Sequence, residues 1–114
     1  MTFTYEYPRP EVVVIGAVFG IDDDGLKIIL RERLFEPFQG HWALPGGYLR
    51  ENEPLETTLR RELLEDTGLS DVFLDQVQTF GDPSRDLRTR ILAVSYLGQI
   101  NLRDKQVRKA TDKK

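Results

Sequence analysis

One segment of this chain has the periodicity of an α-helix, and it lies between segments that have the character of β-strands. Residues 54–67 carry apolar side chains spaced for one helix face, and Pro54 suits the first turn. Gly68 stands just beyond the last turn, where a left-handed residue commonly ends a helix. Asn52 and Glu53 are the candidate N-cap residues. Residues 54–67 are therefore predicted to form an α-helix.

The segments around this helix are rich in β-branched and aromatic residues. Residues 12–19 read as a buried strand, which ends at an acidic Asp-Gly turn at 22–25. The pattern resumes at 26–31, so these two segments are expected to pair as a hairpin. Further strands are expected at 71–80 and 89–100.

Composition limits the chemistry that the chain can perform. With 114 residues it forms one domain, expected over residues 1–100, followed by a basic polar tail at 101–114. The absence of cysteine excludes disulfides, zinc thiolate sites, thiol nucleophiles and cysteine-held iron clusters. A net charge of −3 gives no general attraction to nucleic acids or acidic membranes, and no apolar run reaches membrane-spanning length. We therefore expect a cytoplasmic protein without membrane or direct nucleic-acid partners.

Three carboxylates gather at the end of the expected helix. Glu62, Glu65 and Asp66 are spaced i, i+3 and i+4, so they are neighbours on the helix surface near its negative end. Each of these proximities is unfavourable for folding by itself, whereas a divalent cation would reverse the sign of all of them. Mg²⁺ and Mn²⁺ prefer such oxygen ligands. The alternative is an ordinary solvated acidic face.

The glycines and charges before these carboxylates complete a longer pattern. Gly47 is followed after five residues by Glu53 and after seven more by the run at 61–69, RELLEDTGL. This spacing resembles the Nudix box, the signature of hydrolases acting on nucleoside diphosphates linked to another moiety, here at 47–69. The resemblance implies a Nudix domain of the α+β class, an α/β/α sandwich with a mixed β-sheet. We expect the family's C-terminal strand and helix to be missing from this chain.

The resemblance also implies roles for individual residues. Asp66 stands where the family usually has glutamate, which is one methylene longer. The late loop glutamate that many members carry as general base has no counterpart here. Either Glu62 or Glu65 takes the role of the base, or the domain is shortened with impaired activity, or a partner subunit completes the site. The implied ligands of Mg²⁺ or Mn²⁺ are Glu62, Glu65, Asp66 and Gly46; the implied catalytic residues are Glu62 and Glu65; and the implied structural residues are Glu53, Arg61 and Gly68.

A second resemblance narrows the substrate. The segments 7–10, 37–42 and 80–90 are similar to those of bacterial ADP-ribose pyrophosphatases and of ADP-ribose-sensing regulators of NAD metabolism. Guanidinium groups of the third segment suit diphosphate oxygens, although they could instead pair with Asp82 and Asp86. The implied substrate contacts are Gly47, Arg85, Arg88 and Arg90.

The resemblance leaves three functions open. The first is Mg²⁺-dependent hydrolysis of ADP-ribose to AMP and ribose 5-phosphate, and the second is non-catalytic sensing of ADP-ribose in the regulation of NAD metabolism. The third, hydrolysis of damaged nucleoside triphosphates, differs from the first only in substrate preference. A small nucleotide is the expected partner in each case, and the resemblance allows a homodimer. Trp42 is expected to pack in the core, with adenine stacking as the alternative, and His41 is expected to be a polar loop residue.

Overall fold

The structure, a computed structural model, describes residues 9–33, 36, 38–82 and 90–103. The elements, in chain order, are β1 (Glu11–Asp22), β2 (Gly25–Ile28), β3 (Arg31–Glu32), β4 (Trp42–Ala43), β5 (Gly46–Tyr48), α1 (Leu55–Thr67), β6 (Phe73–Phe80) and β7 (Ile91–Asn101).

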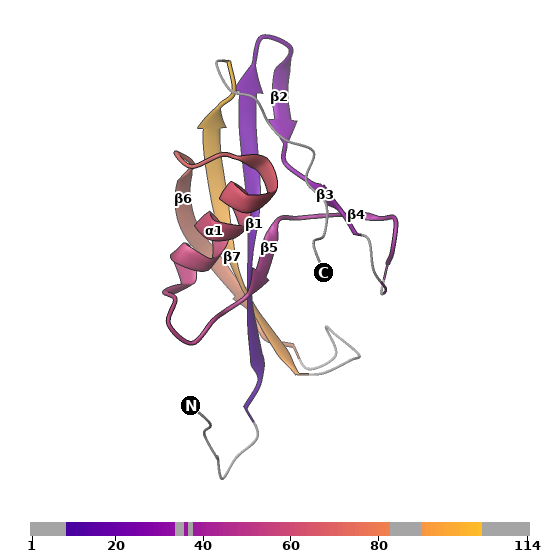
Figure 1. The fold of residues 1–114 in the computed structure, drawn as a ribbon, viewed down its shortest axis with the longest axis vertical. Coiled ribbons are helices and arrows are strands. Elements are labelled where there is room, and N and C mark those ends of the chain that lie inside the picture. The colour runs from indigo at the N-terminus through magenta and orange to yellow at the C-terminus, as the bar shows by residue number, and fades with distance from the viewer. Residues whose placement is uncertain (1–8, 34–35, 37, 83–89, 104–114) are drawn as a thin grey trace.

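Strand β1 organises the larger sheet. It runs parallel to β7 along nearly its whole length and antiparallel to β2 and β5 at its two ends. Strand β6 pairs antiparallel with β7, so the strand order is β2-β1-β7-β6. Strands β3 and β4 form a separate two-stranded sheet, here called the β3–β4 hairpin. The mixture of parallel and antiparallel pairs confirms the expected α+β class with a mixed sheet (Figure 1).

The hairpin expected after the first strand is confirmed, but its second half is divided. Asp22 pairs with Gly25, whose φ of 117° is one that glycine adopts readily. Strand β2 then ends at Ile28, and the expected strand 26–31 does not continue as one unit. Arg31 instead pairs with Ala43, because the chain leaves the edge of β1 and forms the β3–β4 hairpin.

The ends of α1 differ in how well they could be predicted. Gly68 adopts the left-handed conformation with φ 79°, as expected for a residue that ends a helix. The prediction of a side-chain N-cap at Asn52 or Glu53 is wrong, because the N-cap is Pro54 and it makes no side-chain cap hydrogen bond. The Glu53 carboxylate instead accepts hydrogen bonds from Arg61, which lies nearly two turns into the helix.

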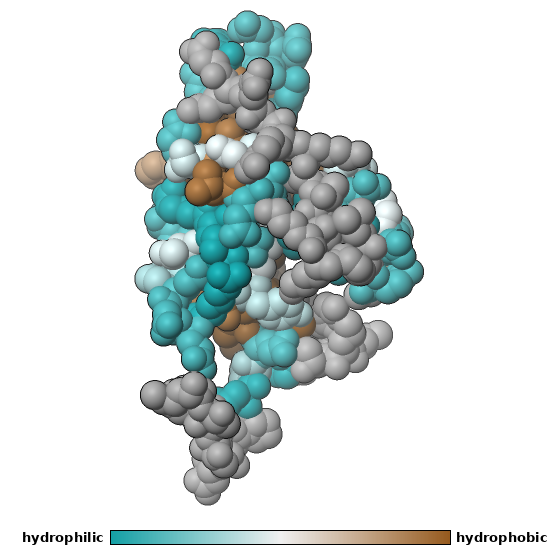
Figure 2. Space-filling model, viewed as in Figure 1, coloured by the Kyte–Doolittle hydropathy of each residue, from teal (hydrophilic) through white to brown (hydrophobic). Residues whose placement is uncertain are grey.

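The core lies between α1 and one face of the sheet. Leu59 and Leu63 of α1 are fully buried and belong to one apolar cluster with Val14 and Val18 of β1. Leu59 also lies directly above Gly16, where a Cβ atom would meet its side chain. Figure 1 shows α1 in front of the sheet, and the surface seen from that side is largely hydrophilic (Figure 2).

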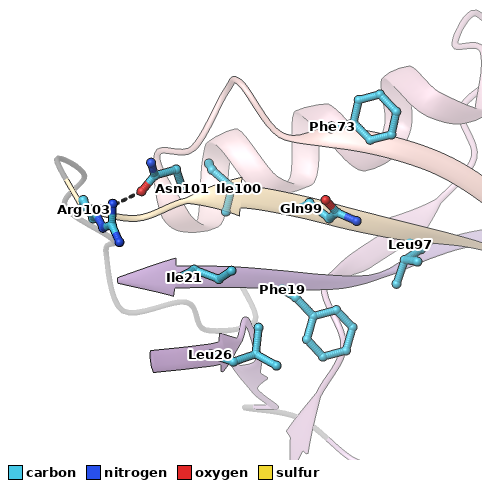
Figure 3. A pocket seen from close by; sticks show the side chains of 9 residues that line it. All are labelled: Phe19, Ile21, Leu26, Phe73, Leu97, Gln99, Ile100, Asn101 and Arg103. Atoms are coloured by element: carbon cyan, nitrogen blue, oxygen red, sulfur yellow. Dashed lines mark hydrogen bonds between the residues drawn. The ribbon is translucent and has the colours of Figure 1, made fainter. Parts of the chain in front are cut away.

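The opposite face of the sheet carries an apolar groove. Side chains alternate along a strand, so Phe19 and Ile21 point away from the face that bears Val14 and Val18. They border a groove of about 860 Å³ (Figure 3). The groove is lined by Phe19, Ile21, Leu26, Phe73, Leu97, Gln99, Ile100, Asn101 and Arg103. Within the described ranges, helix packs against the sheet only through α1, on the other face.

The described part of the chain ends shortly after β7. Strand β7 continues to Asn101, and Leu102 lies over Gly20 of β1 and donates its backbone N–H to the carbonyl of Ile21 at 2.8 Å. The rest of the expected basic tail lies outside the described residues. Among the residues that are described, no helix is long and apolar enough to cross a membrane.

Candidate functional site

A charged pair joins the loop before α1 to the helix itself. Arg61 Nε donates to Glu53 Oε2 at 2.8 Å, and its Nη2 donates to Glu53 Oε1 at 3.1 Å. Thr58, which is completely buried, donates its hydroxyl to the same carboxylate at 2.9 Å. These bonds stabilise the ionised carboxyl, so the pKa of Glu53 lies below its ordinary value, with the Arg61 hydrogen bond as the largest cause. The pair fixes the loop-helix junction in one geometry.

The same guanidinium also faces the carboxylates of the helix. Arg61 Nη1 lies 3.2 Å from Glu62 Oε1 and 3.7 Å from Glu65 Oε2. The pKa of Arg61 is raised, first by its hydrogen bonds with Glu53, although burial acts in the opposite direction. The Arg61 guanidinium therefore holds Glu62 and Glu65 on the same side of α1. Glu62 lies next to residues 45–47, here called the glycine turn.

The two glycines of that turn allow its backbone to approach the helix. Strand β5 pairs with β1 through Gly46 and Gly47, which places this strand against α1. A Cβ atom on Gly47 would collide with the Glu62 carboxylate, so only glycine permits this approach. A Cβ atom on Gly46 would collide with the backbone carbonyl of Val14. The structure thus brings Gly47 against Glu62, and Arg61 lies beside both Glu62 and Glu65.

Asp66 lies apart from that group. Its side chain is only 1% exposed, whereas the Glu65 side chain is 43% exposed. Its Oδ2 lies 3.6 Å from Nη1 of Arg31, which comes from β3. The implied metal ligands are therefore divided between two environments, one beside Arg61 and one beside Arg31.

The donors beside Gly47 fit a divalent cation of the Mg²⁺ type. Within the described ranges, no three Asp, Glu or His side chains converge as a ready-made metal centre. Mg²⁺ does not require one, because proteins usually hold it through one or two carboxylates while substrate phosphates and waters complete the shell. Glu62 and Glu65 supply two carboxylates, and the crowding at Gly47 shows that the backbone of β5 comes within contact distance of the first of them.

Most of the expected substrate loop, including Arg85, Asp86 and Arg88, lies outside the described residues. Arg90 is exposed at the start of β7 and donates its Nη1 to the backbone carbonyl of Gly81 at 2.6 Å. This bond ties the two ends of the loop together.

The aromatic residue beside the glycine turn is not where the sequence suggested. Trp42 is 58% exposed, so the prediction that it packs in the core is wrong. It belongs to β4 of a two-stranded hairpin that has too little sheet around it to bury an indole ring. His41 is an exposed loop residue as expected, with Nδ1 3.2 Å from the carbonyl oxygen of Phe38.

Sequence reasoning missed Arg31 and Thr58. Thr58 is one turn before Glu62, and its small polar side chain on the buried side of the helix was a signal for a carboxylate partner. Arg31 gave no such signal, because nothing in the linear sequence connects it with Asp66.

Comparisons with known proteins identify the family of this chain. A model of the NUDIX domain matches residues 10–112. A curated relative from Acinetobacter baylyi, the ADPR responsive transcriptional repressor NtrR, is 37% identical over 100 residues, which are 86% of this chain and 40% of the repressor. The ADP-ribose pyrophosphatase of Methanocaldococcus jannaschii is 35% identical over 81 residues, 71% of this chain and 48% of that enzyme. The chain thus spans less than half the length of these two curated relatives.

Solved structures point the same way. The NUDIX domain of Shewanella oneidensis NrtR, crystallised with ADP ribose, superposes with a TM-score of 0.79 at 32% identity, covering 93% of this chain and 71% of that domain. The NrtR of the same organism crystallised with a 27mer DNA gives a TM-score of 0.73 at 35% identity, covering 80% of this chain and 42% of that protein. The expectation that nucleic acid is no partner therefore has no support from these relatives. From the family match across most of its length, we conclude that this chain belongs to the NUDIX domain family.

Proposed function

We propose that this chain hydrolyses the diphosphate of a nucleoside diphosphate derivative, with ADP-ribose cleaved to AMP and ribose 5-phosphate. The observation that carries the proposal is the close approach of Gly47 to Glu62, with Arg61 holding Glu62 and Glu65 on one side of α1. The relative named as an ADP-ribose pyrophosphatase and the related domain crystallised with ADP ribose favour this substrate class.

The residues that would hold Mg²⁺ or Mn²⁺ are Glu62 and Glu65, with the backbone of Gly46 beside them. A cation at this place supplies positive charge against the charge that builds on the diphosphate, and it lowers the pKa of bound water. Ligation by Asp66 stays a prediction from the resemblance, because its side chain is buried beside Arg31 and not beside Arg61.

The chain's own residues would perform three tasks. The carboxylate of Glu62 or Glu65 accepts a proton from the attacking water, whose oxygen forms the new bond to phosphorus. The bond between that phosphorus and the bridging oxygen breaks, and the bridging oxygen leaves on the other product with its electron pair. Arg61 keeps Glu62 oriented through the bond at 3.2 Å, so proton acceptance occurs from a fixed position.

We assign the diphosphate contacts to Gly47, Arg85, Arg88 and Arg90. Forked guanidinium donors suit diphosphate oxygens, and Arg90 lies at the base of the loop that carries the other two arginines. A cytoplasmic location and a homodimer also stay predictions from sequence.

The direct test is AMP release from ADP-ribose, with and without Mg²⁺, on folded protein. We expect AMP to appear only with the metal, and we expect Glu65→Gln to lower turnover at least about a hundredfold. Glu56→Gln is the matched control, because Glu56 is exposed in the first turn of the same helix and pairs with Arg60 at 2.8 Å. The control variant should retain turnover within about twofold. Equal loss in both variants would contradict the assignment of Glu65.

A second candidate function is favoured by the position of Asp66. Because Asp66 is buried beside Arg31, fewer carboxylates are left near Gly47 than in the pattern that the resemblance implies. A chain with a weakened centre could bind ADP-ribose and leave it intact, and one relative is named as an ADPR-responsive repressor. Saturable binding of ADP-ribose that is recovered unchanged after incubation with Mg²⁺ would favour this sensor and contradict the hydrolase.

A further inference from the structure

We infer that Asp66 anchors Arg31, and thereby ties the β3–β4 hairpin to the last turn of α1, instead of serving as a ligand of the divalent cation. The inference rests on the proposed metal site at Glu62 and Glu65, and it gives the third carboxylate of the helix a different task.

The helix directs Asp66 towards the sheet. Asp66 follows Leu63 by three residues and Leu59 by seven, and side chains with this spacing share one helix face. Both leucines are fully buried in the core. Glu65 lies about 100° or more around the helix from each of these residues and is far more exposed. Asp66 therefore occupies a core position of α1, and its side chain, one methylene shorter than glutamate, stays near the helix axis.

A carboxylate at a core position requires a nearby positive charge. Removing an ion from water is strongly unfavourable unless a partner compensates it. Arg31 provides that charge, with Nη1 at 3.6 Å from Oδ2 and a side chain that is itself mostly buried. Arg61 contacts Glu53, Glu62 and Glu65 instead. The two arginines thus serve different carboxylates on the same helix.

The Arg31–Asp66 pair involves a strand pair that leads into the glycine turn. Arg31 pairs with Ala43, and the chain continues from Ala43 through Pro45 to Gly46. The carbonyl of Pro45 accepts the backbone N–H of Gly16 at 3.0 Å, which fixes the far side of this segment on β1. Arg31 in turn connects β3 with Asp66 of α1. The Arg31–Asp66 contact therefore ties the β3–β4 hairpin to the helix without including Glu62 or Glu65.

The first test is thermodynamic coupling between the two side chains. Arg31→Met and Asp66→Leu should each lower the folding equilibrium constant at least about tenfold, because each leaves one buried charge without its compensation. The folding equilibrium constant of the double variant should exceed, by about tenfold or more, the value expected from multiplying the two single losses. The exposed pair Glu56–Arg60 on the same helix is the control, and its cycle of glutamine variants should couple by less than about threefold. Additive losses at Arg31 and Asp66 would overturn the inference.

The second test is Mn²⁺ binding to the full chain, measured by electron paramagnetic resonance without substrate. Asp66→Asn should keep the Mn²⁺ dissociation constant within about threefold, whereas Glu65→Gln should raise it about tenfold or more. A loss in Asp66→Asn equal to that in Glu65→Gln would overturn the inference, and so would tighter binding by about tenfold in Asp66→Glu. If Asp66→Asn does not fold, the double variant Arg31→Met with Asp66→Leu carries the same measurement and the same expected result.

The two tests separate this inference from the proposed function. If Glu62→Gln and Glu65→Gln both leave Mn²⁺ binding unchanged, the proposed metal site is wrong. The coupling between Arg31 and Asp66 then still decides whether Asp66 is an anchor.

Discussion

At the scale of single residues, Arg61 is the charge on which the candidate site depends. It bonds Glu53 through two nitrogens and also faces Glu62 and Glu65. Arg61→Ala would leave these partly buried carboxylates beside one another without their shared cation. We expect the melting temperature to fall by about 5–10 °C, together with AMP release.

Lys27→Ala is the control for this prediction, because Lys27 pairs with Asp22 at 2.9 Å on the surface. Its melting temperature should change by less than about 3 °C. An Arg61→Ala protein that melts like the wild type and yet loses turnover would show that Arg61 acts on the reaction and not on the geometry.

Acid should weaken the Glu53–Arg61 pair. The pKa of Glu53 in the folded protein is lowered from its ordinary value of 4.5, mainly by the hydrogen bond from Arg61. The unfolded chain therefore binds this proton at higher pH than the folded chain does. The stabilisation is complete above the unfolded value and is lost as the pH falls through the folded value.

We accordingly expect the free energy of unfolding to fall more steeply between about pH 5 and pH 3 in the wild type than in Glu53→Gln. Urea titrations at several pH values measure both slopes. Parallel pH profiles would contradict the assignment of this pair as the source of the effect.

At the scale of elements, Gly46 and Gly47 differ in the atoms that a methyl group would meet at each position. A Cβ atom on Gly47 would meet the end of the Glu62 side chain, which can rotate away, whereas a Cβ atom on Gly46 would meet the backbone of Val14 and Ile15, which cannot. Gly47→Ala should therefore displace Glu62, and we expect it to lower AMP release at least about tenfold while lowering stability by less than about 1 kcal/mol.

Gly46→Ala serves as its counterpart. It should lower the free energy of unfolding by about 2 kcal/mol or more, because the β1–β5 pairing must shift to admit the methyl group. Thermal unfolding and AMP release of both proteins measure the contrast. Equal stability losses would contradict the distinction between a mobile and an immobile neighbour.

At the scale of the whole molecule, the described residues bury one face of the sheet and leave an apolar groove on the other. Leu63 lies in the core beneath α1, whereas Phe73 lines the groove and is 67% exposed. Leu63→Ala should lower the free energy of unfolding by about 2–5 kcal/mol, and Phe73→Ala by less than about 1 kcal/mol.

Urea unfolding of the two variants measures this difference. Comparable losses would mean that the groove is covered in solution, contrary to the exposure of its lining residues. The comparison also tells whether the core beneath α1 carries the stability of this small domain.

The sequence by itself determined the parts of this protein whose causes are local. Helix α1, its left-handed end at Gly68 and the spacing of Glu62 and Glu65 follow from periodicity and backbone preference within a few turns. The pattern at 47–69 is contiguous, so the family could be identified without any tertiary contact. The side-chain cap was predicted wrongly, because Glu53 is used by Arg61 across the helix turn and not by the backbone.

Only the tertiary structure decided which of these residues share an environment. Asp66 and Glu65 are adjacent in the sequence, yet packing against the sheet buries the first beside Arg31 and leaves the second exposed beside Arg61. Trp42 is exposed because, among the residues that the structure describes, its short strand pairs with β3 alone, which no local pattern indicates. The physical reason is that periodicity specifies the face of an element on which a side chain lies, whereas its partners are set by the other elements that pack there.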